Sequence, residues 1–274
     1  MMDGKAVAER VRAEVAKEVS AFGPVGLATV LVGEDPASHV YVRLKQEAAA
    51  EAGIAAKDVR LPETTSEAEL LDIVAGLNAD DAVDALLVQL PLPKGIDEVR
   101  VIRALDPDKD VDGLHPLNAG ELMLARPRIV PATARGVMEI LAEYRIELDG
   151  ARAVVVGRSE IVGKPVAQLL EQANATVTIC HSHTRDLARR TLDAEVLVVA
   201  AGRPAMVSSD MVAAGAAVVD VGINRTDAGL VGDVDPSVAE VAAFMTPVPG
   251  GVGPMTIACL LQNAVVCARL RRGA

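Results

Sequence analysis

The chain has 274 residues, of which 51% are hydrophobic and only 1% aromatic, and its formal net charge is −11. This length allows one large domain or two small ones, each with a core of Val, Leu, Ile and Ala. The acidic balance disfavours nucleic acids and anionic membranes as partners, and the scarcity of aromatic rings removes the stacking platforms that single-strand binders use. An anionic small molecule could still be bound by local Arg and Lys residues and by helix N-termini.

The N-terminal residues and the cysteines favour a cytoplasmic protein. Residues 1–19 are charged and amphipathic, with no apolar segment of the kind found in signal peptides, so they predict a helix. We find no run of about 18 apolar residues and therefore expect no membrane span. The three cysteines are widely spaced and form no CxxC pair. They argue against a disulfide framework and a zinc site, so we predict no bound metal.

Strand and helix patterns alternate along the first half of the chain. Apolar runs predict strands over 26–32, 56–61 and 84–90, and amphipathic runs predict helices over 38–52 and 66–78. Such strand–helix–strand units imply a parallel sheet covered by helices. The stretch 106–120 is rich in Asp, Pro, Gly and His, and we interpret it as a loop that carries function.

A second alternating set follows, with the boundary between two α/β halves expected within 120–150. Its expected elements are a helix over 134–147, strands over 151–156, 175–180, 195–200 and 217–221, a helix over 163–173, a Gly/Pro-rich loop over 244–256 and a final helix over about 256–272.

Tyr41 and Lys45 lie four residues apart in the predicted helix 38–52, which ends at Gly53, so the phenol and the amine share one helical face. They are therefore a candidate acid/base pair. The alternative, which this stretch alone favours, is a solvated surface lysine beside a half-buried tyrosine.

A candidate dinucleotide site follows the predicted strand 151–156. Gly157 makes a tight turn, and Gly163 opens a helix whose N-terminus could hold phosphate. Ser159 interrupts a regular GxGxxG pattern, so an ordinary strand–helix turn is the alternative. The stretch 180–185 lacks the acid that usually holds the ribose of NAD. With Arg158 nearby, this suits the 2′-phosphate of NADP, and NAD is the less favoured cofactor.

Seven segments together carry a family resemblance. They are VGEDPAS followed two residues later by YVRLK, then VQLPLP, KDVDGLHPLN, VVVGRSEIVGKP, ATVTICHSHT, GDVDP and TPVPGGVGPMT. In this order and spacing the chain resembles the bifunctional methylenetetrahydrofolate dehydrogenase/cyclohydrolase family over almost its whole length. Without a long extra segment for a synthetase domain, it is similar to the compact form with two activities.

The resemblance implies a two-step reaction of one-carbon metabolism. NADP⁺ takes a hydride from 5,10-methylenetetrahydrofolate, and water then converts the methenyl cation to 10-formyltetrahydrofolate. The implied catalytic residues are Lys45 as general acid/base, Gln89 as the group that positions it, Tyr41 near the folate and Asp112 as the carboxylate that holds the pterin. The same four residues are expected to bind substrate, together with Pro249, Gly250 and Gly251. The implied cofactor-binding residues are Gly157, Arg158, Ser159, Ile161, Ser182, Thr133 and Ile223.

These roles agree with the chemistry of the side chains. Water addition needs a proton acceptor and ring opening a proton donor, and a lysine serves both only when its pKa lies nearer neutrality than that of a solvated amine. Gln89 can hydrogen-bond an amine without fixing its charge. A carboxylate such as Asp112 can accept two hydrogen bonds from an amino-pterin edge. Taken singly, Gln89 could instead cap a strand end and Asp112 could form an Asx-turn.

Two departures from the family pattern stand out. The segment 129–136 keeps Thr133 and Gly136 where relatives show a TPCTP-x-G-like sequence, but Val130, Ala132 and Ala134 replace other residues. These changes could alter the binding of cofactor or folate. His183 stands where a lysine is common. Of the other two histidines in family segments, we interpret His115 as structural and His181 as either structural or adjacent to the cofactor.

We therefore predict an α/β protein of two lobes. Residues 1–134 form an N-terminal α/β catalytic domain, on which the C-terminal helix within 252–274 packs back, and residues 135–251 form a Rossmann-like doubly wound cofactor domain. The resemblance also implies a homodimer through the cofactor lobe. Two other functions remain open: a dehydrogenase without cyclohydrolase activity, and a non-catalytic NADP-binding regulatory protein.

Overall fold

The computed structural model describes residues 1–227 and 229–273, so residue 274 of the predicted C-terminal range lies outside the described residues. The chain divides into two compact units, each described by itself below. The first unit comprises Arg10–Ala132 and Ile257–Ala274, and the second unit comprises Met1–Glu9 and Thr133–Thr256. Helix α1 (Gly4–Phe22) and helix α9 (Val252–Arg272) each contribute residues to both.

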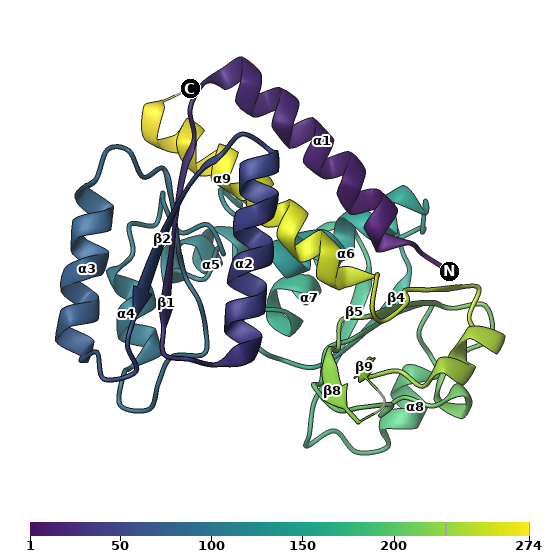
Figure 1. Ribbon diagram of the computed structural model, residues 1–274. Coiled ribbons are helices and arrows are strands. Elements are labelled where there is room, and N and C mark those ends of the chain that lie inside the picture. The colour runs from purple at the N-terminus through teal and green to yellow at the C-terminus, as the bar shows by residue number, and fades with distance from the viewer. Residues whose placement is uncertain (228, 274) are drawn as a thin grey trace. The chain divides into compact units, whose positions relative to one another are not determined.

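A small parallel sheet forms the centre of the first unit. Its strands are β1 (Gly26–Val32), β2 (Ala55–Leu61) and β3 (Ala85–Val88), in the order β2-β1-β3. Its helices are α2 (Pro36–Glu51), α3 (Glu67–Ala79), α4 (Glu98–Ala104) and α5 (Pro116–Met123). Figure 1 shows β1 and β2 running between α2 and α3. Every residue of β1 is buried, as expected for a central parallel strand covered on both faces.

Local sequence chemistry sets the ends of α2, the helix that carries Tyr41 and Lys45. The Asp35 carboxylate accepts a hydrogen bond from the Ser38 backbone N–H at 2.8 Å, and Pro36 occupies the first turn, where a missing N–H costs nothing. Gly53, with φ +77°, lies just past the other end, a conformation that glycine adopts without strain.

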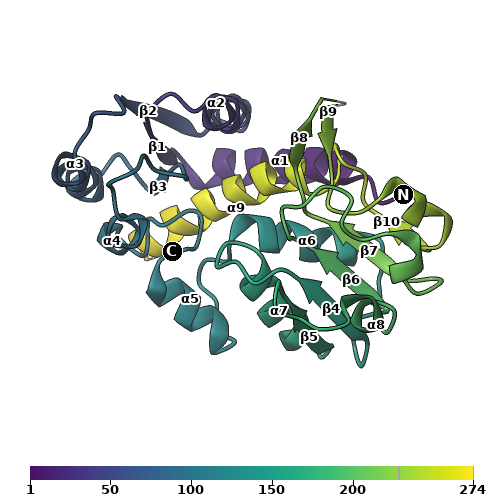
Figure 2. The same cartoon turned by 90° about the horizontal axis from the view of Figure 1, so that it is seen from below.

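A larger parallel sheet forms the centre of the second unit. Its strands are β4 (Arg152–Val156), β5 (Thr176–Cys180), β6 (Val196–Val199), β7 (Ala217–Asp220) and β10 (Phe244–Met245). Their order, β10-β7-β6-β4-β5, is that of a doubly wound sheet. The other elements are α6 (Ala132–Glu143), α7 (Gly163–Gln172), α8 (Leu187–Thr191), the short 3-10 helices η1 (Ser209–Met211) and η2 (Pro236–Glu240), and the hairpin β8 (Asn224–Thr226) and β9 (Gly229–Val231), which Figure 2 shows from below.

The expected limits of two loops were wrong. The predicted loop 106–120 ends early because α5 begins at Pro116, where His115 Nδ1 accepts the Leu117 N–H at 3.1 Å. The predicted loop 244–256 contains β10, and α9 begins at 252 rather than 256. Pro254 does not prevent this early start, because proline is tolerated in the first turn of a helix.

Helix α9 packs back on the first unit through its C-terminal part. Arg271 and Arg272 reach the buried carboxylate of Asp84 at 3.1 and 2.6 Å. By length and composition α9 could cross a membrane, but 61% of its apolar window is buried within the protein, as in the core helices of many proteins. The predicted α/β class with two lobes, and the packing of the C-terminal helix on the first, are confirmed.

Candidate active site

The first unit brings Lys45 and Gln89 together. Lys45 is buried on α2, with 6% of the residue exposed, and its Nζ donates to Gln89 Oε1 at 3.2 Å. Gln89 directly follows β3, where its backbone N–H donates to Val30 O at 2.9 Å. Its own Nε2 donates to Leu90 O at 2.7 Å, which turns the amide oxygen toward the lysine. The amine is therefore buried against a neutral acceptor.

Tyr41 lies one turn before Lys45 on α2 and is partly buried. Burial raises the pKa of its phenol above the usual value of 10.0. The hydroxyl therefore stays neutral at physiological pH and can donate a hydrogen bond to a ligand.

Lys109, in the loop between α4 and α5, has a structural role. Its buried Nζ donates to the carbonyl oxygens of Leu77, Asn78 and Asp80 at 3.1, 2.6 and 2.9 Å. These carbonyls end α3, where helical hydrogen-bond partners are lacking. Burial lowers the pKa of Lys109, but its amine already has three acceptors, so it ties this loop to α3.

Two further side chains, those of Asp110 and Asn263, fix the backbone on either side of Asp112. The buried Asp110 carboxylate accepts from the His115 N–H at 2.7 Å and from Asn118 Nδ2 at 2.9 Å, and burial raises its pKa. From α9, Asn263 Nδ2 donates to Val111 O at 2.9 Å and to the carbonyl of residue 130 at 2.8 Å.

Asp112 itself is partly buried, and among the residues that the structure describes its carboxylate has no hydrogen-bond donor. The adjacent Gly113 has φ +68° and lies against Pro131, where an added side chain would meet backbone atoms at 2.9 Å. Asp112 is therefore an acceptor held in place by its neighbours and available to a ligand.

The predicted cofactor turn lies at the carboxyl edge of the second unit's sheet. Gly157 has φ +128°, and an added Cβ would collide with Ala200 O, whereas a Cβ on Gly163 would collide with Gly157 O. Ser159 Oγ accepts the N–H groups of Val162 and Gly163 at 3.2 and 3.3 Å, so its hydroxyl closes the turn into α7. Both glycines are thus required for this tight turn, the geometry with which such sheets hold a pyrophosphate.

Strand register brings the other predicted cofactor residues to the same edge. Cys180, Val156, Val199 and Asp220 pair side by side across β5, β4, β6 and β7. The residues that follow these four therefore line one edge of the sheet. The predicted cofactor-binding residues that are exposed there are Arg158, Ser159, Ile161, Ser182 and Ile223.

Two family models match the chain. The catalytic-domain model of tetrahydrofolate dehydrogenase/cyclohydrolase matches residues 2–112, and the NAD(P)-binding-domain model of the same enzymes matches residues 131–272. The chain belongs to the tetrahydrofolate dehydrogenase/cyclohydrolase family.

Full-length relatives agree with this membership. The chain is 59% identical over 276 residues to the bifunctional protein FolD of Acidiphilium cryptum, covering 99% of each chain. It superposes on the bifunctional enzyme FolD of Campylobacter jejuni with a TM-score of 0.96 and 45% identity, covering 98% of each. The Trypanosoma brucei FolD, whose structure is complexed with NADP and an inhibitor, gives a TM-score of 0.94 and 41% identity over 99% of this chain and 98% of that one. The predicted family, its pairing of an oxidoreductase with a hydrolase, and its nicotinamide cofactor are confirmed.

Residues 129–136, where the chain departs from the family pattern, are mostly inside the protein. Ala132 and Ala134 are buried, with 3% and 0% of each residue exposed, and Gly136 lies against Met255. Thr133 is in the first turn of α6, where its hydroxyl lies 3.1 Å from that of Thr256. Two of the replaced positions are thus buried sites filled by small side chains.

The other predicted folate residues lie in the second unit. Pro249, Gly250 and Gly251 connect β10 to α9, and Gly250 O accepts the Lys5 N–H at 2.9 Å. An added side chain on Gly251 would meet Pro247 O and the Thr246 side chain, so this turn also requires glycine.

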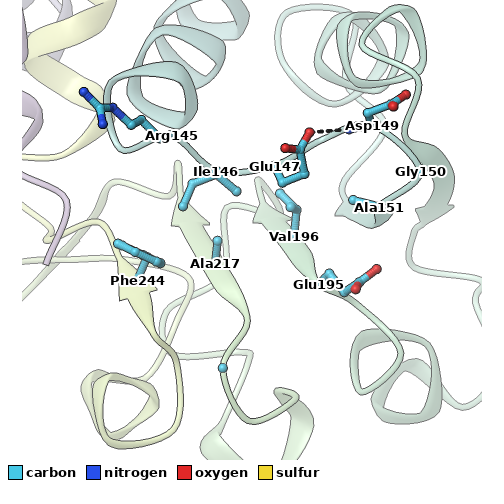
Figure 3. Close-up of a pocket in the computed structure, with 11 residues that line it drawn as sticks. Arg145, Ile146, Glu147, Asp149, Gly150, Ala151, Glu195, Val196, Ala217 and Phe244 are labelled. Atoms are coloured by element: carbon cyan, nitrogen blue, oxygen red, sulfur yellow. Dashed lines mark hydrogen bonds between the residues drawn. The ribbon is translucent and has the colours of Figure 1, made fainter.

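A cavity of about 380 Å³ opens at the opposite, amino edge of the same sheet (Figure 3). Arg145 and Phe244 line one part of it, and the other lining residues include three acids, Glu147, Asp149 and Glu195. These acids disfavour an anionic cofactor, and ligands of doubly wound sheets bind at the carboxyl edge. The cavity is therefore separate from the cofactor turn.

Three residues that organise these sites were not predicted from the sequence: Asn263, Asp220 and Asp233. Asn263 interrupts the apolar run of α9, and a polar residue at a buried helical position was the available signal. The two aspartates lie beside glycines, in DVG and GDVD, which indicates close approach of a carboxylate to backbone.

Asp220 should make folding stability depend on pH. Burial, together with the charge of Asp233, raises its pKa from 3.8 to about 6, although three backbone N–H groups oppose the shift. The folded state therefore holds this proton more tightly, so the stabilisation is complete below pH 3.8 and lost as the pH rises through about 6. Between pH 8 and pH 5 we expect the wild type to gain about 1.4 kcal/mol of unfolding free energy relative to Asp220→Asn. Urea titrations at both pH values measure this difference, and parallel pH dependences would contradict it.

Proposed function

We propose that this family member oxidises 5,10-methylenetetrahydrofolate with NADP⁺ and hydrolyses the methenyl product to 10-formyltetrahydrofolate, with Lys45 as general acid/base. The observation that carries the proposal is the buried Lys45 amine held at 3.2 Å by the Gln89 amide oxygen. Because Gln89 is neutral, it can orient the amine in both of its protonation states. An aspartate or glutamate in its place would favour the charged state alone.

When bound, NADP⁺ supplies the acceptor for the hydride. In the hydrolytic step, water adds to the methenyl carbon while the Lys45 amine takes one proton. The bond between that carbon and N5 then breaks: the new hydroxyl group loses its proton to solvent and becomes the formyl oxygen, and the Lys45 ammonium returns its proton to N5. The net change adds one water and releases one proton, so the lysine ends as it began.

Other residues are proposed to bind the two ligands. The Asp112 carboxylate would accept hydrogen bonds from the pterin, near Tyr41, and Pro249, Gly250 and Gly251 would contact the folate. The cofactor residues proposed from the family pattern are Gly157, Arg158, Ser159, Ile161, Ser182, Thr133 and Ile223. The domain limits 1–134 with 252–274, and 135–251, remain part of this proposal.

One assay tests both the activities and the cofactor. Purified protein is given methylenetetrahydrofolate with NADP⁺ or NAD⁺, and methenyltetrahydrofolate alone. We expect reduction of NADP⁺ in preference to NAD⁺, and accelerated decay of the methenyl substrate. Dehydrogenase activity without that decay would support a monofunctional enzyme, and NADP binding without turnover would support a regulatory protein.

Arg158→Ala should raise the KM for NADP⁺ about 10- to 100-fold, the worth of one charge-assisted hydrogen bond to a phosphate. The KM for NAD⁺, which lacks that phosphate, should change less than about twofold. Arg145→Ala is the matched control, since Arg145 is exposed at the opposite edge of the sheet. Equal effects of Arg158→Ala on both cofactors would remove the argument for the 2′-phosphate.

We also propose a homodimer through the cofactor lobe, in the cytoplasm. β5 is an edge strand of the larger sheet, and both Thr178 and Ile179 are exposed. An exposed edge of this kind can pair with its own copy about a twofold axis. Light scattering of the purified protein tests the assembly, and a monomer at micromolar concentration would contradict it.

A further inference from the structure

Two buried carboxylates lie behind the carboxyl edge of the larger sheet. Asp220 is the last residue of β7, and Asp233 lies between β9 and η2, with 1% and 0% of each residue exposed. Neither belongs to the proposed cofactor contacts. Buried carboxylates are costly unless hydrogen bonds satisfy them, so their partners indicate what they do.

Asp233 binds the backbone turn that follows β6. Its Oδ2 accepts the N–H groups of Ala201 and Gly202 at 2.6 and 2.7 Å, and its Oδ1 accepts the Arg203 N–H at 2.8 Å. Asn224 Nδ2 also donates to Oδ1 at 2.8 Å. One side chain thus fixes the turn after β6 and reaches the loop after β7.

Asp220 in turn holds Asp233. Its Oδ1 accepts the N–H groups of Gly222 and Asp233 at 2.9 and 3.0 Å, and its Oδ2 accepts the Val234 N–H at 3.0 Å. The first of these bonds also fixes the start of the loop that carries Ile223.

Two glycines make room for the carboxylates. A Cβ on Gly222 would collide with the Asp233 side chain, and a Cβ on Gly232 would collide with the Asp220 side chain. Each carboxylate therefore faces backbone that carries no side chain, which allows the close approach of the three loops.

The turn held by Asp233 borders the cofactor turn directly. Ala200 O lies against Gly157, where a side chain would not fit, and the Ala200 N–H donates to Val156 O at 2.7 Å. The backbone at 201–203 therefore lies at the same edge of the sheet as the proposed pyrophosphate turn, after the neighbouring strand.

We propose that Asp233, held in place by Asp220, is a positioning residue for the nicotinamide cofactor: it fixes the turn 201–203 and the loop 222–224 that border the bound ligand. This inference rests on the proposed dehydrogenase function. It predicts that loss of Asp233 impairs the dehydrogenase activity and not the cyclohydrolase activity, because hydrolysis of the methenyl substrate needs no cofactor.

The test is Asp233→Asn, which replaces one acceptor oxygen by an NH₂ group and so leaves two of the four donors unpaired in either orientation of the amide. We expect the KM for NADP⁺ to rise about 10-fold or more, with the cyclohydrolase rate within about twofold of wild type. Asp235→Asn, two residues along in the same segment, is the matched control and should change neither value. Among the residues that the structure describes, Asp235 accepts hydrogen bonds from Ser237 alone.

Asn224→Ala is the second variant, and it tests the positioning role of Asp233 if the Asp233→Asn protein does not fold. It keeps both carboxylates and removes one donor, so a smaller rise in the NADP⁺ KM, about threefold, is expected with normal hydrolysis. An equal loss of both activities, or no change in either variant, would overturn the proposal. A wild-type protein without dehydrogenase activity would instead contradict the proposed function.

Discussion

Lys45→Met should slow the hydrolysis of methenyltetrahydrofolate by about 10²- to 10⁴-fold, the range typical for loss of a general acid/base. Methionine keeps the length and burial of the side chain but can neither take nor give a proton. Because Lys45 is buried and held by a neutral amide, its replacement leaves no unpaired charge behind. The decay of methenyl absorbance with purified variant measures the effect.

Lys57→Met is the control for this substitution. Lys57 is exposed on β2 and pairs with Asp80 at 2.8 Å, and exposed ion pairs contribute little. Its rate should stay within about twofold of wild type. A Lys45→Met protein that hydrolyses the methenyl substrate at the normal rate would exclude Lys45 as the proton-transferring group.

Helices and strands were predicted correctly from the sequence where the local sequence signals were strong. β1 is a continuous apolar run, and α2 has a capping residue, a proline and a terminal glycine in the expected places. The sequence did not predict α4, α5 or α8, which have only seven, eight and five residues. In α5 the start depends on His115 turning its ring back as a cap, which apolar periodicity does not report.

The candidate site was predictable only in part, because its contacts join distant parts of the chain. Nothing local indicates that Lys45 meets Gln89, and it was the family pattern that linked them. The pairing of Asn263 with carbonyls at 111 and 130 depends on how α9 packs, so it could not be foreseen from either segment. The buried pair Asp220 and Asp233 likewise required the register of β6 and β7.

Hydrogen-bond satisfaction separates structural from chemical groups in the first unit. Lys109 and Lys45 are both buried lysines, but within the part of the chain that the structure describes Lys109 donates to three carbonyl oxygens and Lys45 to one amide oxygen. Asp110 and Asp112 differ in the same way. A fully satisfied group holds the fold, whereas a partly satisfied one retains capacity for a ligand or a proton.

This contrast leads to an expectation for Asp112→Ala. Loss of two charge-assisted hydrogen bonds to the pterin should lower kcat/KM for the folate by about 10²-fold or more, and Asp112→Asn, which keeps one acceptor, by about 10-fold. Stability should change by less than about 0.5 kcal/mol, since the carboxylate has no donor among the described residues. Steady-state kinetics and urea unfolding of the same preparations measure both quantities.

Substitutions of two other aspartates serve as reference variants for Asp112→Ala. Asp110→Ala removes the acceptor of the His115 N–H and one of the two acceptors of the Asn118 amide nitrogen, so it should cost about 2 kcal/mol of stability. Asp81→Ala removes an exposed carboxylate and should alter neither stability nor kinetics. If Asp112→Ala kept a normal kcat and KM, the pterin would have to be held by other groups. If it unfolded as readily as Asp110→Ala, its role would be to hold the loop rather than the substrate.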